Sequence, residues 1–191
     1  FNSINNKGII IDPAYGSQEI VSWLQENEIS LEAILITHAH FDHMAGAKIV
    51  SLAASPAVPI GLHPVDIPLW EAKGGAEQFG FQIDLNSRPD FTFEHNEIIQ
   101  FAGIELKVFH TPGHSPGHVI FYCQNLNAAF CGDVIFKNGI GRSDVLGGNH
   151  ETLINSIRDS ILTLPENTQL YCGHGSDTTV AHESENNPFL K

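Results

Sequence analysis

The chain has 191 residues, 42% hydrophobic and 16% charged, and a formal net charge of −13 with neutral histidines. This composition suits a compact globular protein, and the excess of acidic groups disfavours contact with a nucleic-acid backbone. No stretch reaches the roughly 18 consecutive apolar residues of a membrane helix. We therefore expect neither a nucleic acid nor a membrane as partner, and one domain over residues 1–191, whose native start could lie upstream of Phe1.

The three cysteines, Cys123, Cys131 and Cys172, are too few for a disulfide framework. Each lies in an apolar stretch, where a reduced cysteine behaves as a small hydrophobic residue. We therefore expect a reducing compartment and predict a cytoplasmic location. Eleven histidines are unusual for this length, and their grouping carries the functional argument.

In the first part of the chain, apolar runs alternate with helical patterns. Ser17 is expected to cap a helix that carries Ile20, Trp23 and Leu24 on one face. Proline ends the first apolar run, which predicts a buried strand there. The predicted elements are a strand over Gly8–Asp12, a helix over Ser17–Glu28, a strand over Leu31–Thr37, a helix over His43–Ala53, a strand over Val58–Leu62 and a short helix over Pro64–Ala72.

The segment Gly74–Asp90 has three glycines and few periodic apolar positions, which predicts a long loop. It contains two phenylalanines, Phe79 and Phe81, that we expect to be exposed. Long loops in compact domains are often functional, and a plain surface insertion is the alternative.

The remaining sequence predicts two hairpins, a helix and a last short strand. Ala102-Gly103 and the polar segment Gln124–Asn127 are the expected hairpin turns. The predicted elements are strands over Ile98–Phe101, Ile104–Val108, His118–Cys123 and Ala128–Cys131, a helix over Glu151–Leu164 and a strand over Leu170–Cys172. Strands followed by a helix in each half predict two packed sheets with helices outside, an α/β (α+β) fold.

The first group of candidate ligands is the string Thr37-His38-Ala39-His40-Phe41-Asp42-His43, at the end of a predicted strand. Strand alternation would place His38 and His40 on the same side. Asp42 and His43 follow where the chain turns into a helix, so they can reach from another direction. Four such side chains can surround two ions, and imidazole and carboxylate ligands suit Zn²⁺, Fe or Mn²⁺ at roughly 2.0–2.2 Å.

Three further groups also follow predicted strands. His114 lies between two Pro-Gly turns that fix its backbone, Asp133 offers a carboxylate that can bridge two ions, and His174 adds one more imidazole. His110 and His118 are expected to pack or to form hydrogen bonds rather than to bind metal.

The strings His-x-His-x-Asp-His, Pro-Gly-His, Gly-Asp and Gly-His, in this order, resemble those of the metallo-β-lactamase superfamily. The resemblance extends from Ile9 to Phe189. It implies an αββα sandwich of two mixed sheets, with helices on the outer faces and the metals at one edge of the sheets. It also implies that one metal is held by His38, His40 and His114, and the other by Asp42, His43 and His174, with Asp133 bridging.

Within this superfamily, the segment Gly132–Asp144 resembles the glyoxalase II (hydroxyacylglutathione hydrolase) branch. The segment Gly173–Phe189 resembles the short bacterial members of that branch. Typical zinc β-lactamases have a cysteine or another residue where Asp133 stands, so the resemblance disfavours a lactamase.

Two features depart from an ordinary glyoxalase II. The sequence ends soon after His174, so no helical C-terminal domain is expected. Asp144 and Ser176 stand where the family has tyrosines that contact glutathione. Arg142 stands where the family has a basic residue, and we expect it to bind an acidic end of the substrate.

The resemblance implies a metal-dependent thioester hydrolase acting on S-lactoylglutathione or a related small-molecule thioester. Two divalent ions, Zn²⁺ or else Fe or Mn²⁺, would supply a metal-bound hydroxide as nucleophile, and Asp42 and Asp133 would act catalytically as ligands. The thiolate leaving group needs little protonation, because thiols are far more acidic than alcohols. A mononuclear-iron persulfide dioxygenase and a lactonase are the enzymatic alternatives. A metal-storage domain is the non-enzymatic alternative, which an open ligand rim disfavours.

Overall fold

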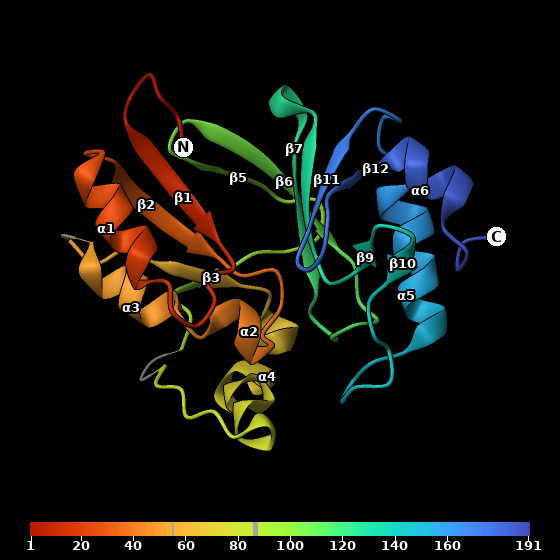
Figure 1. Cartoon of the computed structure of the whole chain (residues 1–191), viewed down its shortest axis with the longest axis horizontal. Helices are drawn as coiled ribbons and strands as arrows, with labels where there is room; N and C mark the ends of the chain where they lie inside the picture. Colours follow the sequence, from red (N-terminus) through yellow and green to blue (C-terminus); the bar gives the residue numbers. More distant parts are fainter. Residues whose placement is uncertain (55, 86–87) are drawn as a thin grey trace. The chain divides into compact units, whose positions relative to one another are not determined.

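The computed structural model describes residues 1–54, 56–85 and 88–191. These residues form two compact units (Figure 1). The first unit comprises Phe1–Phe93 with Gln100–Ile104, and the second comprises Glu94–Ile99 with Glu105–Lys191. The single domain over residues 1–191 stays a prediction.

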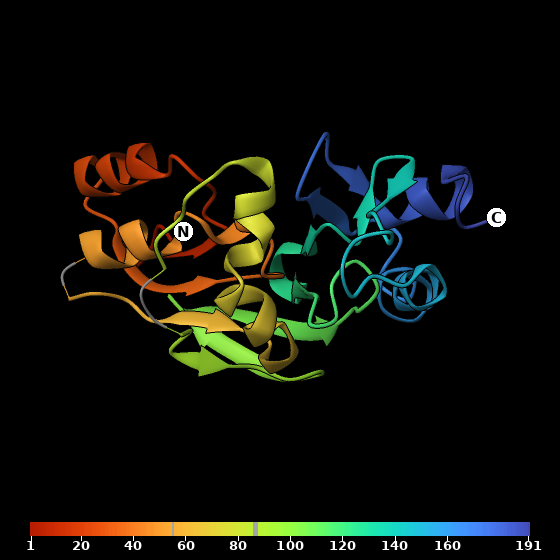
Figure 2. The ribbon, with the colours of Figure 1, turned by 90° about the horizontal axis from the view of Figure 1, so that it is seen from below.

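The first unit contains a four-stranded sheet with the order β1-β2-β3-β4, and each pair of neighbouring strands is parallel, whereas a mixed sheet was predicted. Its strands read as nearly continuous apolar runs, as expected for a parallel sheet with helical crossovers. Helices α1 and α3 contact each other and lie side by side on one side of the sheet (Figures 1 and 2). The elements are β1 (Lys7–Ile11), α1 (Gln18–Glu26), β2 (Ser30–Leu35), α2 (Phe41–Met44), α3 (Ala47–Ala53), β3 (Ile60–Leu62) and β4 (Phe91–Thr92).

Helix α1 packs only part of its expected face against the core. Val21 and Leu24 pack against the hydrophobic core, whereas Ile20 and Trp23 are 39% and 46% exposed. Ser17 occupies the N-cap position, but its hydroxyl donates to a backbone carbonyl of the preceding turn and caps no helical amide. Of the predicted face, Leu24 packs against the core, whereas Ile20 and Trp23 remain exposed. Apolar residues lie on more than one side of this helix, so their spacing alone does not identify the packed side.

The single helix predicted over His43–Ala53 is two helices, α2 and α3, separated near Gly46. The amide of Gly46 donates to the carbonyl of Pro13 at 2.8 Å. A Cβ at position 46 would lie 2.3 Å from the carbonyl oxygen of Ala14. The break therefore lets the turn after β1 approach the backbone that follows the histidine motif.

The predicted loop over Gly74–Asp90 is partly helical. Two short helices precede it, η1 (Pro64–Asp66) and α4 (Ile67–Glu71), which together match the predicted short helix. The 3-10 segment η2 (Lys73–Phe79) then covers the beginning of the loop, and its glycines at 74 and 75 have positive φ angles. Residues 86–87 of the loop lie outside the described residues.

The second unit contains most of a six-stranded sheet with the order β12-β11-β8-β7-β6-β5. Strand β11 is parallel to β8, whereas β12/β11, β8/β7 and β7/β6 are antiparallel, so this sheet is mixed as predicted. Positive φ angles at Ala102 and Gly103 form the predicted hairpin turn. The strands are β5 (Ile98–Phe101), β6 (Ile104–His110), β7 (Val119–Cys123), β8 (Ala128–Gly132), β11 (Gln169–Cys172) and β12 (Thr178–Thr179), with a separate pair, β9 (Ile135–Phe136) and β10 (Gly139–Ile140).

The predicted helix over Glu151–Leu164 is present as α5 (His150–Ser156), which continues into one π-helical turn, η4 (Ile157–Ile161). Its apolar stripe packs against the apolar face of the six-stranded sheet. The C-terminal helix α6 (Val180–Asn186) was not predicted, because its sequence is mostly polar. Within residues 1–54, 56–85 and 88–191, no helix combines the length and apolar character needed to cross a bilayer.

Candidate metal centre

Four predicted ligands lie in the first unit, just after β2. The rings of His38 and His43 are buried with centroids 4.2 Å apart, and the His40 ring lies edge-on to His38 at 4.8 Å. Strand β2 ends at Leu35, so a turn, rather than strand alternation, brings these rings together. On α2, Oδ2 of Asp42 lies 3.9 Å from Nε2 of His43.

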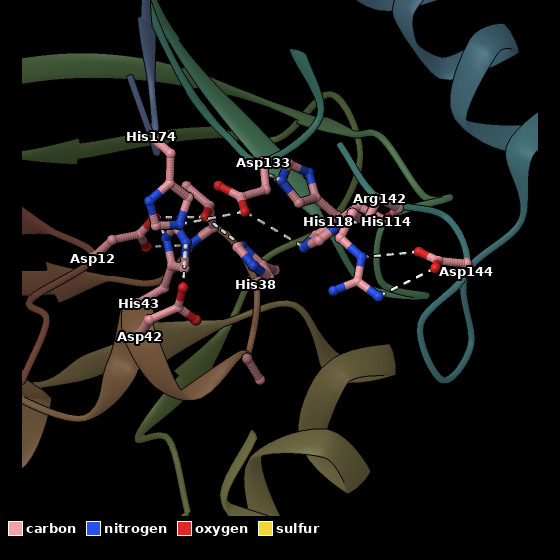
Figure 3. A network of polar contacts seen from close by, with 12 residues as sticks. Asp12, His38, Asp42, His43, His114, His118, Asp133, Arg142, Asp144 and His174 are labelled. Carbon is pink, nitrogen blue, oxygen red and sulfur yellow. Dashed lines mark hydrogen bonds and ion pairs between the residues drawn. The ribbon is translucent and has the colours of Figure 1, made fainter. Parts of the chain in front are cut away.

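Hydrogen bonds fix which nitrogen of each buried ring carries the proton (Figure 3). The Thr37 hydroxyl donates to Oδ2 of Asp12 at 2.6 Å, so its oxygen is left to accept from Nδ1 of His38 at 3.0 Å. Nδ1 of His43 lies 3.0 Å from the same carboxylate oxygen and donates to it. This arrangement puts the lone pair of each ring on Nε2, the form in which imidazole binds a metal.

Asp12 is a site residue that the sequence interpretation missed. Its ligand atom lies within 4.8 Å of those of His38 and His43, so the three form a possible cation site in the first unit. Its carboxylate also accepts from the amide of Thr37 at 2.7 Å. With three hydrogen bonds to Thr37 and His43, Asp12 orients this part of the predicted ligand set. A polar residue directly after three isoleucines was the available signal.

The backbone of the histidine turn is held from another side by the segment that follows β3. The fully buried carboxylate of Asp66 accepts from the amide of Ala39 at 3.0 Å. At Gly74, a Cβ would lie 2.4 Å from the backbone nitrogen of Phe41. These contacts fix the backbone at Ala39, between the two histidines, and at Phe41, directly after them.

The second unit brings together His114, Asp133 and His174. Oδ2 of Asp133 lies 3.7 Å from Nε2 of His114 and 3.6 Å from Nε2 of His174 (Figure 3). These separations are long for hydrogen bonds. Two ligands on one tetrahedral ion, each about 2.1 Å from it, stand about 3.4 Å apart. Each of the two separations is therefore close to the distance between two ligands of one ion.

Two of these predicted ligands, His114 and Asp133, are each positioned by a hydrogen bond. Nδ1 of His114 donates to the carbonyl of Arg142 at 2.7 Å, which again directs Nε2 towards the carboxylate. His118 is fully buried and accepts from the amide of Asp133 at 3.1 Å, while its Nδ1 lies 2.9 Å from the Thr111 hydroxyl. His118 therefore forms hydrogen bonds, as predicted.

Tight backbone packing and the ring of His110 complete this arrangement. A Cβ at Gly141 would lie 1.8 Å from the carbonyl oxygen of Asp133, so only glycine fits beside that residue. His110, predicted to be structural, has Nε2 2.9 Å from the carbonyl of Pro116 in the segment that carries His114.

Arg142 is exposed, and its guanidinium forms a bidentate pair with Asp144 (Figure 3). Nε lies 2.9 Å from Oδ1, and Nη2 lies 3.1 Å from Oδ2. The hydrogen bond from Arg142 lowers the pKa of the Asp144 carboxyl, and the same bond raises the pKa of Arg142. The guanidinium thus holds a carboxylate of its own loop, and its predicted role towards a substrate stays a prediction.

The three cysteines lie outside the groups of possible metal ligands found among residues 1–54, 56–85 and 88–191. Cys123, Cys131 and Cys172 are all free thiols. Burial, followed by nearby carboxylates, raises the pKa of Cys172 to about 12, and burial raises the pKa of Cys131 well above its usual value. The groups of possible ligands in the described residues offer nitrogen and oxygen donors, which suit zinc, iron or manganese.

Residues 4–174 match the family model described as the metallo-beta-lactamase superfamily. The chain belongs to the metallo-β-lactamase superfamily. It is 37% identical over 185 residues to the probable metallo-hydrolase YqgX of Bacillus subtilis, and 38% identical over 184 residues to the hydroxyacylglutathione hydrolase GloC of Haemophilus influenzae. Both alignments cover 95% of this chain and 86% of the relative.

Solved structures agree with this membership. The BLEG-1 B3 metallo-β-lactamase matches with a TM-score of 0.93 and 36% identity, covering all of this chain and 91% of that one. TTHA1623, solved in a di-iron-bound form, matches with a TM-score of 0.85 and 36% identity, covering 95% of this chain and 88% of that one. The predicted fold class, the α/β fold of the metallo-β-lactamase superfamily, is confirmed. The ligand set of seven residues as a whole stays a prediction.

Proposed function

We propose that the chain is a metal-dependent hydrolase of S-lactoylglutathione or a related small thioester. In this proposal, two divalent ions are held by the seven predicted ligands. The observation that carries it is the carboxylate of Asp133, which faces the Nε2 atoms of His114 and His174 at 3.7 and 3.6 Å. The relative named hydroxyacylglutathione hydrolase, at 38% identity, supports the thioester as substrate class.

The donor chemistry supports zinc or iron as the bound metal. Imidazole and carboxylate ligands accept either, and a similar protein at 36% identity was solved with two irons. When bound, such ions act as Lewis acids and lower the pKa of water towards neutrality. We propose zinc as the first candidate and iron as the second.

The chain's own groups would prepare and orient the site. Asp12 and Thr37 hold the rings of His38 and His43 with their protons on Nδ1. The preset rings need no reorganisation during the reaction, which is how a preorganised site lowers a barrier. Arg142 would bind an acidic end of the substrate through its planar fork.

The test combines metal analysis with an assay of thiol release from S-lactoylglutathione. We expect close to two divalent ions per chain, and turnover that a chelator abolishes. Asp133→Ala should lower the metal content below two and remove most of the activity. Asp159→Ala, a change at an exposed carboxylate on η4, is the matched control. Unchanged metal content and rate in Asp133→Ala would overturn the ligand assignment.

β-Lactam hydrolysis is the second candidate function. The observation that favours it is the 36% identity with a protein described as a B3 metallo-β-lactamase. A chromogenic cephalosporin, assayed beside the thioester on the same preparation, separates the two functions. A larger kcat/KM for the cephalosporin than for the thioester would replace thioester hydrolysis by β-lactam hydrolysis.

A metal content of one iron per chain, with oxygen uptake when a persulfide is added, would instead show a dioxygenase.

A further inference from the structure

An exposed cluster of aromatic rings lies beside the histidine turn in the first unit. We call it the aromatic platform, and it consists of Tyr15, Phe41, Phe79 and Phe81. The Phe41 ring is 5.3 Å from each of the rings of Phe79 and Phe81, and the Tyr15 ring is 6.0 Å from Phe81. Although these rings contact one another, Tyr15, Phe79 and Phe81 stay 68%, 64% and 42% exposed.

Three separate segments build the aromatic platform. Tyr15 comes from the turn after β1, and Phe41 begins α2. Phe79 ends η2, and Phe81 is the second residue after it. Gly80 has a φ of 78°, and the amide of Phe81 donates to the carbonyl of Ala76 at 3.0 Å, so a closed turn presents Phe81. Folding thus gathers rings from distant positions in the sequence.

The aromatic platform is joined to the predicted ligands through the backbone. Phe41 stands between His40 and Asp42 in the chain. At Gly74, a Cβ would lie 2.4 Å from the nitrogen of Phe41 and 2.5 Å from the carbonyl oxygen of Ala39, so the loop packs directly on the ligand turn. Phe41 is therefore a chain neighbour of two predicted ligands, and its ring belongs to the turn that presents them.

Exposed aromatic rings remain in contact with water unless something covers them, and clusters of this kind commonly mark binding sites. A membrane surface is a poor occupant, because the formal charge of −13 repels anionic lipids. The direct connection to the ligand turn favours the substrate over a second copy of the chain.

We propose that the aromatic platform binds an apolar alkyl or aryl substituent of the substrate, on the acyl side or the thiol side of the scissile bond. This inference rests on the proposed thioester hydrolysis and names the part of the substrate that sets specificity. Each methylene that leaves water for an apolar surface gains about a two- to fourfold preference, according to how completely it is covered. The protein therefore prefers thioesters with longer apolar substituents.

The test is a set of thioesters that vary one side at a time. In the first arm the thiol is N-acetylcysteamine, and the acyl group lengthens from acetyl to octanoyl. In the second arm the acyl group is lactoyl, and the thiol changes from N-acetylcysteamine to benzyl mercaptan. We expect kcat/KM to rise by about two- to fourfold per methylene, or comparably with the phenyl group, in one of the two arms.

Phe79→Ala and Phe81→Ala should each flatten this rise, lowering the ratio of kcat/KM for long and short substrates by about tenfold. Phe189→Ala, which removes a 50% exposed phenylalanine from the second unit, is the matched control. Phe79→Gln tests the same point if an alanine variant fails to fold. A rise that is equally steep in the variants would overturn the inference.

A binding measurement separates this inference from the proposed function. The non-hydrolysable S-octyl thioether of N-acetylcysteamine is titrated calorimetrically into the wild-type protein and the Phe79→Ala variant. Binding that is about tenfold weaker in the variant supports the aromatic platform, even if the wild-type protein cleaves no thioester and the proposed function fails. Equal binding overturns the inference while leaving the proposed function intact.

Sedimentation of both proteins tests self-association. If the wild-type protein is a dimer, and Phe79→Ala is a monomer with unchanged affinity for the thioether, these rings mediate self-association and the inference is overturned.

Discussion

Oδ2 of Asp12 lies 3.0 Å from Nδ1 of His43, although the two residues are 31 positions apart in the sequence. The same oxygen accepts from the hydroxyl of Thr37, which in turn accepts from His38. One carboxylate therefore sets the proton positions of two predicted metal ligands. A partner of this kind fixes the orientation of a histidine and raises its basicity as a ligand.

Asp12→Asn should weaken metal binding by about 10- to 100-fold, because the amide keeps the shape but loses the charge that favours a donated Nδ1 proton. Asparagine tolerates the φ of 51° at this position, so the change adds little backbone strain. Competition with a chromophoric chelator measures the affinity. Asp159→Asn provides a control for the loss of one negative charge, and equal affinity in both variants would contradict the orienting role.

His118→Ala should lower the free energy of unfolding by about 1–3 kcal/mol, because it leaves the amide of Asp133 without its acceptor in a buried position. Urea unfolding of the protein in excess chelator measures this loss apart from metal binding. His118→Gln should recover part of it, since a glutamine oxygen can accept from the same amide. Stability equal to the wild type in the alanine variant would show that this hydrogen bond contributes nothing.

Asp144→Ala should lower KM for thioesters that carry a carboxylate, because the guanidinium of Arg142 no longer has its bidentate partner. Arg142→Ala should raise KM for the same substrates with little change in kcat, as expected when an interaction common to ground and transition states is lost. Steady-state kinetics with S-lactoylglutathione and an uncharged thioester checks both effects. If KM for the anionic substrate is the same in all three proteins, Arg142 does not bind it.

Glu32 should make the stability of the first unit dependent on pH. The hydrogen bond from Lys7 and then that from the amide of Ala102 lower the pKa of Glu32 from 4.5. A lowered carboxyl pKa means that the stabilisation is complete above about pH 4.5 and is lost as the pH falls through the folded-state value. Solvent screening of this partly exposed pair limits the contribution to about 1 kcal/mol.

The measurement for Glu32 is urea unfolding of the wild type and Glu32→Gln at neutral and acidic pH, with chelator present throughout. We expect the wild type to be more stable at pH 7, and the difference to shrink towards pH 3. Concentrated salt at neutral pH should reduce the same difference, since it screens exposed charges. A constant difference across this range would show that the charge of Glu32 has no part in it.

Local signals in the sequence were sufficient for most strands and for the ligand strings. The apolar runs of β1, β2 and β7 and the turn at Ala102-Gly103 predicted strands and a hairpin that the structure contains. Strand pairs of two residues, such as β9 and β10, were missed because so short a segment has no period to detect. The break at Gly46 coincides with close contacts to Pro13 and Ala14, which lie more than 30 positions away in the sequence and leave no room for a side chain at position 46.

The sequence by itself identified the candidate metal ligands, because the strings His-x-His-x-Asp-His, Pro-Gly-His, Gly-Asp and Gly-His are each contiguous in the chain. Only the tertiary structure decided how those side chains are oriented. Asp12 reaches His43, His118 accepts from the amide of Asp133, and Phe81 stacks on Phe41. Each pair joins segments that are separate in the sequence. Local periodicity cannot report such partners, because packing of the folded chain selects them.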